Sequence, residues 1–236
     1  MDNKLPLHIE EYQSGQVFIF DKPLDWTSFD LVGKIRYRIC KKFGIKKLKV
    51  GHAGTLDPKA TGLMIICTGK FTKRIEEMQG LEKEYIAEIK LGATTPSFDV
   101  ETEEDNEYKT EHITRELLES ALEKFIGDIE QVPPIYSAVM VNGKRAYEHA
   151  RKGEHVEIKP KSINISCLEI LDFNMNKLVL RIVCSKGTYI RSLARDLGEA
   201  LGSGAYLTGL VRSRVGTYVL SNSYSVEEFL EQLDAS

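Results

Sequence analysis

The sequence has 236 residues, of which 42% are hydrophobic and 28% are charged. These values are ordinary for a soluble globular protein, and the chain is long enough to bury a substantial core. The longest purely apolar stretch near a motif, residues 63–67, is far too short to span a bilayer. No apolar signal region follows Met1, so we expect a cytoplasmic protein.

The cysteine and histidine residues predict no metal site. The four cysteines are widely spaced without a CxxC pair, and the five histidines form no HxxxH or HExxH pattern. A zinc ribbon or a thioredoxin-like motif is therefore not expected. Each cysteine lies in an apolar context, so we expect buried free thiols.

The charges are unevenly distributed along the chain. The net charge of −3 and the pI near 6.0 argue mildly against nucleic-acid binding. Residues 34–49, however, contain no acid and eight basic residues: Lys34, Arg36, Arg38, Lys41, Lys42, Lys46, Lys47 and Lys49. A polyanion responds to the local field and not to the total charge. This basic segment is either a solvated helix face or a surface for a polyanion.

The N-terminal part of the chain predicts a strand, a helix and a second strand. The first strand is expected over residues 17–20 and ends at Pro23. Thr27, or the serine after it, can cap the helix that follows. Apolar residues recur in that helix at helical spacing, with the basic residues off the apolar stripe. A loop rich in glycine and proline over 44–62 then leads to an apolar strand over 63–67.

The rest of the chain mixes strands and helices without regular βαβ alternation. The expected elements are a short helix (69–78), a strand (85–91), a helix (117–125), a strand (136–141), a basic helical turn (144–152), two antiparallel strands (163–171 and 178–184), a helix (193–201) and a capped final helix that begins at Ser225. This order favours an α+β fold with a mixed, largely antiparallel sheet flanked by helices. We expect one domain over residues 1–236, with an inserted excursion around 133–161.

The most informative segment runs from Gly51 to Gly62. Its three glycines permit tight turns and close approach of a ligand. Pro58 biases Asp57 away from helical geometry, so its carboxylate sits on an extended or turning backbone. Taken alone, an Asp-Pro pair in such a loop usually marks only a turn.

Residues 51–75, GHAGTLDPKATGLMIICTGKFTKRI, resemble the catalytic motif of the TruB family of tRNA pseudouridine synthases. Further segments match that family in its order: Phe20-Asp21-Lys22-Pro23 with Trp26-Thr27-Ser28, then Lys83-Glu84-Tyr85, then residues 185–193 (SKGTYIRSL) and finally residues 207–215. The similarity covers roughly residues 17–218. Several ordered motifs of this length make a chance match improbable.

The resemblance implies the pseudouridine synthase fold and the conversion of uridine to pseudouridine in the tRNA T loop, at position 55. Asp57 falls on the family's catalytic aspartate. The target is flipped out of its stack, and its uracil is rejoined to the sugar through C5 in place of N1. Whether Asp57 attacks the base or the sugar C1′ stays open. No cofactor and no metal are needed.

The resemblance also implies partners for Asp57 in catalysis. Arg191 would lie beside Asp57 and hold it ionised, because an opposite charge favours the charged form; the alternative is a surface helix residue. Tyr85 would stack on the flipped uracil, a role that is compatible with a place in the sheet core. Tyr189 and Leu210 would line the same pocket.

Several residues are candidates for RNA contact. His52 either touches RNA or packs against its own chain, and Lys22 either supports the loop or touches phosphate. Beside this motif set, phosphate contact becomes the better interpretation of the basic helix, with Lys41 and Lys42 as its candidates. The excursion resembles the family's RNA-gripping insertion and would add contacts through Lys144, Arg145, Arg151 and Lys152.

Bacterial members of the family usually carry a further small RNA-binding domain of the PUA type, and we expect this chain to lack it. We therefore expect a standalone monomer that contacts the T-arm of tRNA and uses no guide RNA. A non-catalytic RNA-binding factor on the same scaffold is the alternative from another class. The same chemistry on a different RNA is a third possibility, and an unrelated small-molecule enzyme is the least favoured.

Overall fold

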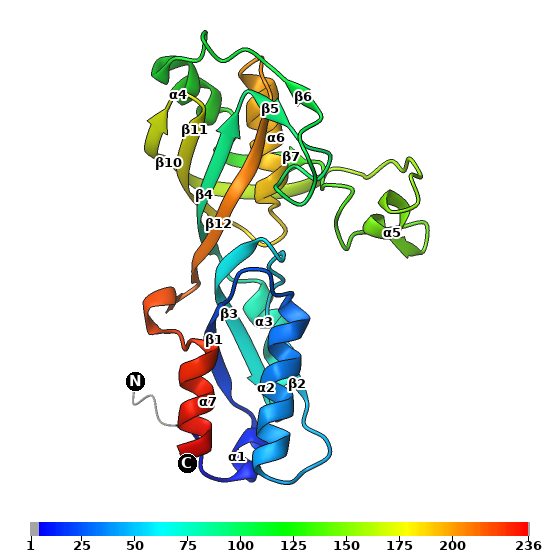
Figure 1. The fold of residues 1–236 in the computed structure, drawn as a ribbon, viewed down its shortest axis with the longest axis vertical. Coiled ribbons are helices and arrows are strands. Elements are labelled where there is room, and N and C mark those ends of the chain that lie inside the picture. Colours follow the sequence, from blue (N-terminus) through cyan, green and yellow to red (C-terminus); the bar gives the residue numbers. More distant parts are fainter. Residues whose placement is uncertain (1–4, 236) are drawn as a thin grey trace. The chain divides into compact units, whose positions relative to one another are not determined.

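The computed structural model describes residues 5–235. The chain forms two compact units, each described by itself: unit 1 is Met1–Lys83 with Val211–Ser236, and unit 2 is Glu84–Leu210 (Figure 1). Two strands, β4 (Lys83–Leu91) and β12 (Ala205–Val215), carry the chain from one unit into the other. Whether the two units act as one catalytic domain stays a prediction.

The sheet of unit 1 is centred on β3 (Ala60–Thr68), which lies between β1 (Val17–Lys22) and the end of β12. β1 runs antiparallel to β3, with Val17 opposite Cys67 and Lys22 opposite Gly62. β2 (Val50–His52) also pairs antiparallel with β3, and β13 (Tyr218–Val219) folds back on β12. Every residue of β3 except Thr61 is buried, as the apolar run in its sequence predicts.

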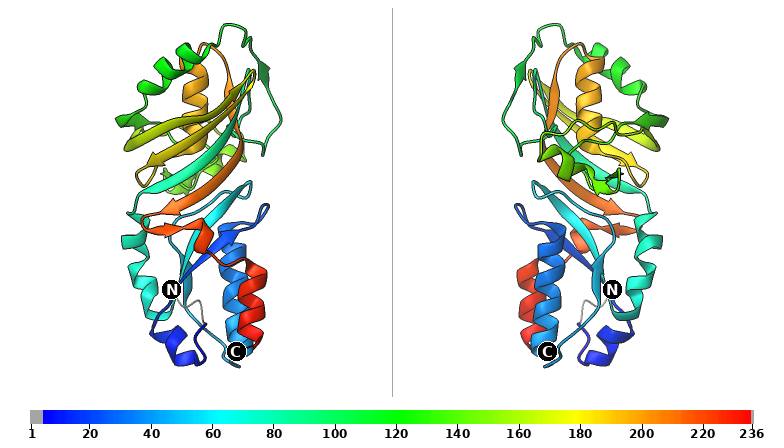
Figure 2. Two further views of the ribbon diagram at one scale, coloured as in Figure 1. Left: turned by 90° about the vertical axis from the view of Figure 1, so that its left-hand side faces the viewer. Right: turned by 90° about the vertical axis from the view of Figure 1, so that its right-hand side faces the viewer.

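Helices surround this small sheet. They are α1 (Ile9–Ser14), α2 (Ser28–Lys42), the 3-10 helix η1 (Gly69–Arg74), α3 (Ile75–Gln79), the 3-10 helix η2 (Leu220–Asn222) and α7 (Val226–Ala235). The two longest, α2 and α7, lie side by side (Figure 2). The short helix predicted over 69–78 is present as η1, which continues directly into α3.

Local signals explain where the two longest helices of unit 1 begin. The Thr27 hydroxyl accepts a hydrogen bond from the Asp30 amide at 3.1 Å, and Asp30 accepts one from the Thr27 amide at 2.8 Å. Ser225 and Glu228 form the same reciprocal cap before α7, at 3.1 and 2.8 Å. Phe229 of α7 is fully buried, so truncating it would cost about 3–5 kcal/mol of stability.

The strands of unit 2 follow the order β12, β4, β11, β10, β7. β10 (Lys161–Asn174) and β11 (Lys177–Cys184) form the predicted antiparallel hairpin, and β7 (Gly127–Gln131) pairs antiparallel with β10. α6 (Ile190–Ala200) lies against this sheet, and α4 (Arg115–Glu123) contacts α6 (Figure 2). A two-stranded ribbon of β5 (Ala93–Thr94) and β6 (Asn106–Glu107) completes the unit.

The segment 133–161 projects as an excursion from unit 2 and carries the short helix α5 (Ala146–Ala150) (Figure 1). The strand expected over 136–141 is wrong for most of its length, because only β8 (Met140–Val141) forms and pairs with β9 (Lys144–Arg145). Neighbouring carbonyl groups have other partners: the first amides of α5 donate to Val139 and Ser137 at 2.8 and 3.0 Å. These carbonyls are therefore not available to a strand ladder.

The observed architecture confirms the predicted α+β class with a mixed, largely antiparallel sheet. β1 and β2 run antiparallel to β3, and β7 and β11 run antiparallel to β10, while isolated parallel bridges join Phe20 to Tyr224 and Asp99 to Leu207. Cys67 and Cys184 are buried as expected, but Cys40 and Cys167 are only half-buried. Within residues 5–235, the helices are all too short or too polar to cross a membrane.

Candidate active site

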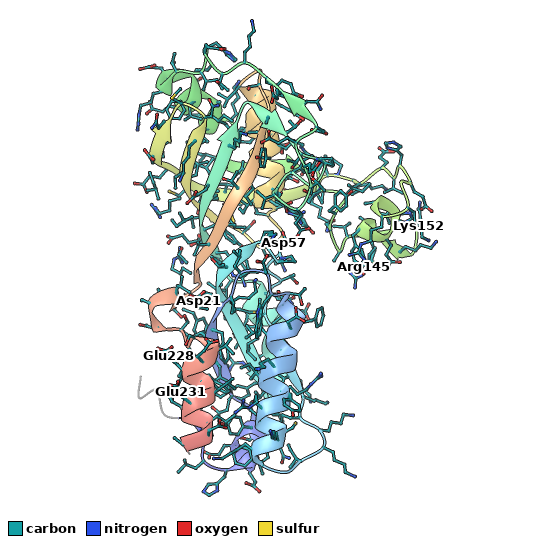
Figure 3. The ribbon with its side chains drawn as sticks, viewed as in Figure 1. Asp21, Asp57, Arg145, Lys152, Glu228 and Glu231 are labelled. Atoms are coloured by element: carbon teal, nitrogen blue, oxygen red, sulfur yellow. The ribbon has the colours of Figure 1, made fainter. Side chains whose placement is uncertain are left out.

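Asp57 lies in the irregular loop that connects β2 to β3 in unit 1 (Figure 3). Its side chain is half-buried, and its carbonyl oxygen accepts the amide of Ala60 at 3.1 Å as the chain turns into β3. Leu56, directly before it, is buried. The loop thus places one carboxylate next to the buried end of a strand.

Arg212, from β12, fixes this loop through hydrogen bonds to its backbone. It is among the most completely buried side chains of the protein, with 1% of its surface exposed. Its guanidinium donates to the carbonyl oxygens of Leu63, Gly54 and Thr55 at 2.7, 3.1 and 3.4 Å. Gly62 lets β12 come this close, because a Cβ there would lie 2.5 Å from the Arg212 carbonyl oxygen. All three of these hydrogen bonds from the Arg212 guanidinium go to backbone carbonyl oxygens, so the backbone satisfies these donors.

Ser28 fixes the loop from α2. Its hydroxyl accepts the amide of Leu56 at 2.9 Å and donates to the Leu56 carbonyl at 3.0 Å, and both groups are buried. Because Leu56 immediately precedes Asp57, this pair of hydrogen bonds fixes the direction of the backbone that leads into Asp57. The motif Trp26-Thr27-Ser28 therefore has a structural role in the site as well as in capping α2.

Lys22 is fully buried, and its ammonium donates to the carbonyl oxygens of Trp26, Pro23 and Pro58 at 2.6, 2.8 and 3.4 Å. Of the two roles that the sequence allowed for Lys22, this geometry matches loop support, and it leaves the ammonium closed to a phosphate. Burial lowers the pKa of Lys22 to about 8, while the neighbouring Asp57 carboxylate acts in the opposite direction. A positive charge thus stands close to Asp57 within unit 1.

His52 ends β2, at the start of the loop, and is half-buried. Its ring meets the exposed ring of Phe29 edge-on, with the centroids 5.5 Å apart. Burial lowers the pKa of His52, which keeps the imidazole neutral near pH 7. Packing against its own chain is therefore observed, and a contact of His52 with RNA stays a prediction.

Arg191, the arginine predicted to act with Asp57, belongs to unit 2. It lies in the first turn of α6 with 5% of its surface exposed, so the alternative of a surface helix residue is wrong. Its guanidinium donates to the carbonyl oxygens of Tyr136 and Ser97 at 3.0 and 3.3 Å, and its Nε lies 3.5 Å from the Asp99 carboxylate. These groups fix the plane of the guanidinium within unit 2.

The other predicted residues of unit 2 lie on three elements. Tyr85 is buried in β4, which agrees with its place in the sheet. Tyr189 directly precedes α6, where its backbone amide and carbonyl bond the Gln131 side chain at 2.8 and 3.1 Å. Leu210 is half-buried in β12. Their contact with a flipped base stays a prediction.

The basic candidates lie on exposed surfaces. Lys41 and Lys42 are exposed at the end of α2, but Lys42 donates to the Asp234 carbonyl of α7 at 3.3 Å. Arg38 pairs with the Asp234 carboxylate, so α7 occupies part of the basic helix face. On the excursion, Arg145 and Lys152 carry exposed side chains (Figure 3).

Three residues of these arrangements were missed by sequence reasoning: Arg212, Ser28 as a loop support, and Asp99. Arg212 lies in the segment 207–215 that resembles the family, but nothing in the sequence marks it as buried, since a strand arginine usually faces solvent. Asp99 lies in a polar segment that predicts only irregular structure. Among residues 5–235, no group of three or more histidine, cysteine or acidic side chains is placed to hold a metal ion.

Comparisons with known proteins agree on one family. Residues 41–190 match the family described as TruB family pseudouridylate synthase (N terminal domain). The chain is 65% identical to a protein named tRNA pseudouridine synthase B from Phocaeicola vulgatus, over 94% of this chain and 95% of that one. It is 51% identical to a protein of the same name from Flavobacterium johnsoniae, over 95% of this chain and 98% of that one.

A solved structure shares the fold. The crystal structure of a Cbf5-Nop10-Gar1 complex contains a chain that matches with a TM-score of 0.71 and 25% identity. The match covers 94% of this chain but only 55% of that one, so this chain spans about half the length of its structural relative. The arrangement of strands and helices is therefore shared with a longer protein.

Proposed function

Because the chain belongs to the TruB family of pseudouridylate synthases, we propose that it isomerises uridine to pseudouridine at position 55, in the T loop of tRNA. The observation that carries this proposal is 65% identity with a tRNA pseudouridine synthase B across nearly the full length of both chains. The organisation of the Asp57 loop supports it, because buried side chains fix the backbone on both sides of the carboxylate.

The reaction breaks the bond between N1 of uracil and C1′ of the ribose, turns the base, and forms a bond between C5 and C1′. The proton on C5 is then lost and N1 gains one, so the product is an isomer of the substrate. We propose Asp57 as the carboxylate that drives the first step, either as a nucleophile or by stabilising the cleaved state. Either role requires an ionised side chain, and the Lys22 ammonium close to Asp57 favours that form.

Arg191 and Tyr85 are proposed as the further catalytic residues. Arg191 would supply a fixed guanidinium toward the reacting carboxylate, since its planar fork suits two-point contact with an oxyanion. Tyr85 would stack on the uracil, with its phenol near the proton that leaves C5. Tyr189, Leu210 and neutral His52 would complete the walls around the base.

The substrate must expose its target before reaction, because the reacting atoms of a stacked base are inaccessible. We propose that the enzyme recognises the shape and the phosphates of the T-arm more than base identity. It would act on tRNA as a monomer, without a guide RNA, in the cytoplasm. The exposed cations of the excursion and of α2 are suited to these phosphate contacts.

A non-catalytic RNA-binding factor is the second candidate function. It is less well supported, because a protein that only binds RNA has no need of a carboxylate held in a fixed loop near buried cations. A third candidate, the same chemistry on another RNA, differs from the first only in its product.

The test is incubation of the purified protein with unmodified tRNA, followed by site-resolved detection of pseudouridine. We expect one modified position, in the T loop, without added metal or cofactor. Pseudouridine at a different position would support the third candidate. Tight tRNA binding without any pseudouridine would support the second and contradict the proposal.

A further inference from the structure

A cavity lined by four lysines lies in unit 1, away from the Asp57 loop. Its volume is about 320 Å³, and its charged lining consists of Lys47, Lys49, Lys70 and Lys73. Leu48, Gly69, Thr72 and Gln13 form the rest of the wall, so no acidic side chain lines it. We call this cavity the lysine pocket.

Three segments that are distant in sequence build the lysine pocket. The loop between α2 and β2 supplies Lys47 and Lys49, η1 supplies Lys70 and Lys73, and α1 supplies Gln13. The amide of Gly69 donates to the Lys49 carbonyl at 2.9 Å, which ties the two lysine-bearing segments together. The fold therefore brings two lysines of the basic segment together with two lysines of η1.

Gly69 makes this convergence possible. It has a positive φ of 51°, and a Cβ at this position would lie 2.1 Å from the Gln13 carbonyl oxygen of α1. A larger residue would push α1 away from η1 and open the pocket wall. The cavity is thus closed on one side by backbone that only a glycine permits.

The four lysines of the pocket have no acidic partner in an ion pair among the described residues. Glu77, on the neighbouring α3, pairs with Arg74 at 3.2 Å instead. Like charges gathered at one concave site repel each other, and an anion that enters lowers this repulsion.

We propose that the lysine pocket binds phosphates of the tRNA backbone outside the T loop. Lysine is a common phosphate ligand, and a protein that contacts RNA through several lysines gains affinity by releasing counterions. This inference rests on the proposed function, since it takes tRNA as the polyanion. Lys47 and Lys49 belong to the basic segment 34–49, and the fold adds Lys70 and Lys73 to them, which the sequence pattern did not predict because these two follow β3.

The distance along β3 shows why this contact lies far from the reacting uridine. The Asp57 loop enters β3 at Ala60, and Gly69 follows its last residue, Thr68. Nine strand residues at about 3.3 Å each span roughly 30 Å. In Figure 1, β3 points toward the end of unit 1 where α1 lies. A phosphate in the lysine pocket therefore belongs to a part of the tRNA that is well separated from the flipped base.

Whole tRNA and an isolated T stem-loop should therefore respond differently to changes in the pocket. We compare Lys70→Gln/Lys73→Gln with the charge-preserving Lys70→Arg/Lys73→Arg and with a matched control, Lys109→Gln/Lys124→Gln, on exposed positions of unit 2. Dissociation constants are measured for both RNAs over a series of salt concentrations, and pseudouridine formation is followed at saturating RNA.

The Gln pair should weaken whole-tRNA binding several-fold and reduce its log–log salt slope by about 1.4–1.8, the value for two lost phosphate contacts. Binding of the stem-loop, and turnover of both RNAs at saturation, should be unchanged. The Arg pair and the unit 2 control should both behave like the unaltered protein.

Two outcomes would overturn the lysine pocket as a tRNA site. One is unchanged whole-tRNA affinity, which would also be the result if the pocket holds only a small free phosphate. The other is equal weakening for the stem-loop, which would place the contact at the T-arm. Pseudouridine formation on the stem-loop separates this failure from a failure of the proposed function, because the stem-loop does not need the pocket.

Discussion

The Asp57 loop and the excursion over 133–161 handle positive charge in opposite ways. Around Asp57, Lys22 and Arg212 are buried, and each donates to three carbonyl oxygens of the loop region. On the excursion, the lysine and arginine side chains are exposed. The cations around Asp57 are buried and bond only backbone carbonyls, whereas those of the excursion are exposed to solvent, including Arg145, which also donates to the Ala138 carbonyl at 2.6 Å.

This difference fits two separate tasks. A reacting carboxylate must be held in place by groups that are themselves fixed, because a small displacement lowers the rate sharply. A surface that grips RNA gains from exposed side chains that adjust to the phosphates. Changes to the buried cations should therefore alter turnover, and changes to the exposed cations should alter affinity.

Among the substitutions of cations, the largest effect is expected for Arg191→Lys. The substitution keeps the charge but loses the planar fork that bonds the Tyr136 and Ser97 carbonyls and approaches Asp99. Turnover at saturating tRNA should fall by about 100-fold or more, the range for removing one positioned electrostatic group. Arg195→Lys, on the same helix, should leave turnover within a factor of two or so. A normal rate for Arg191→Lys would mean that charge alone suffices, or that Arg191 lies outside the site.

Arg212→Lys should have the next largest effect. A lysine can reach some of the carbonyls of Gly54, Thr55 and Leu63 but cannot bond all three in one plane, and each buried carbonyl left unpaired costs about 1–3 kcal/mol. Chemical denaturation should show lower stability, and turnover should fall by roughly ten-fold as the loop loosens. Arg214→Lys, two residues along the same strand, serves as the control. Lower stability with full turnover would show that the brace serves folding only.

The pH dependence should reveal Lys22. Burial lowers its pKa to about 8 from an ordinary value of 10.5, so between these pH values the unfolded chain binds more protons than the folded chain. This group alone therefore makes the folded state more stable as the pH rises through that window. Turnover should change in the opposite direction, with a several-fold decrease above pH 8, because the ammonium near Asp57 is lost.

Both profiles are compared with those of Lys22→Met, which has no group to titrate. The rise in stability and the alkaline decrease in turnover should both disappear in this variant. If turnover of the unaltered protein stays flat to about pH 9.5, Lys22 has no electrostatic role in the reaction.

The smallest effect should come from the excursion. Arg145→Gln with Lys152→Gln should weaken tRNA binding a few-fold and lower the log–log salt slope by up to about 1.4–1.8, with turnover at saturation unchanged. Filter binding at several salt concentrations measures this slope. A changed turnover with an unchanged slope would reverse the assignment, making the excursion part of the chemistry.

Elements with strong local signals were predictable from the sequence. The Thr27 cap of α2 and the Ser225–Glu228 cap of α7 depend on residues three positions apart, and alternating apolar residues define β4. The strand expected over 136–141 forms only at 140–141. Carbonyls of 136–139 bond Arg191 and the first turn of α5, which are contacts from outside the local pattern.

The residues of the candidate site likewise fall into those that a sequence motif identifies and those that only the fold brings together. Asp57 could be identified only because the motif around it resembles a known family, since an Asp-Pro turn alone has a simpler explanation. Ser28 and Arg212 act on the loop from 28 and about 150 residues away in sequence, so no local pattern reveals them. The buried state of Lys22 likewise depends on Pro58, which the fold brings to it.

The most direct test of the account compares turnover and affinity in Asp57→Asn. The amide is nearly isosteric, so Arg212, Ser28 and Lys22 should hold the loop in place, but it is neutral and a very poor nucleophile. We expect pseudouridine formation below detection, with tRNA affinity within a few-fold of the unaltered protein, since phosphate contacts and stacking come from other residues. A variant that still forms pseudouridine at a measurable fraction of the normal rate would contradict the account and make Asp57 a loop-shaping residue before Pro58.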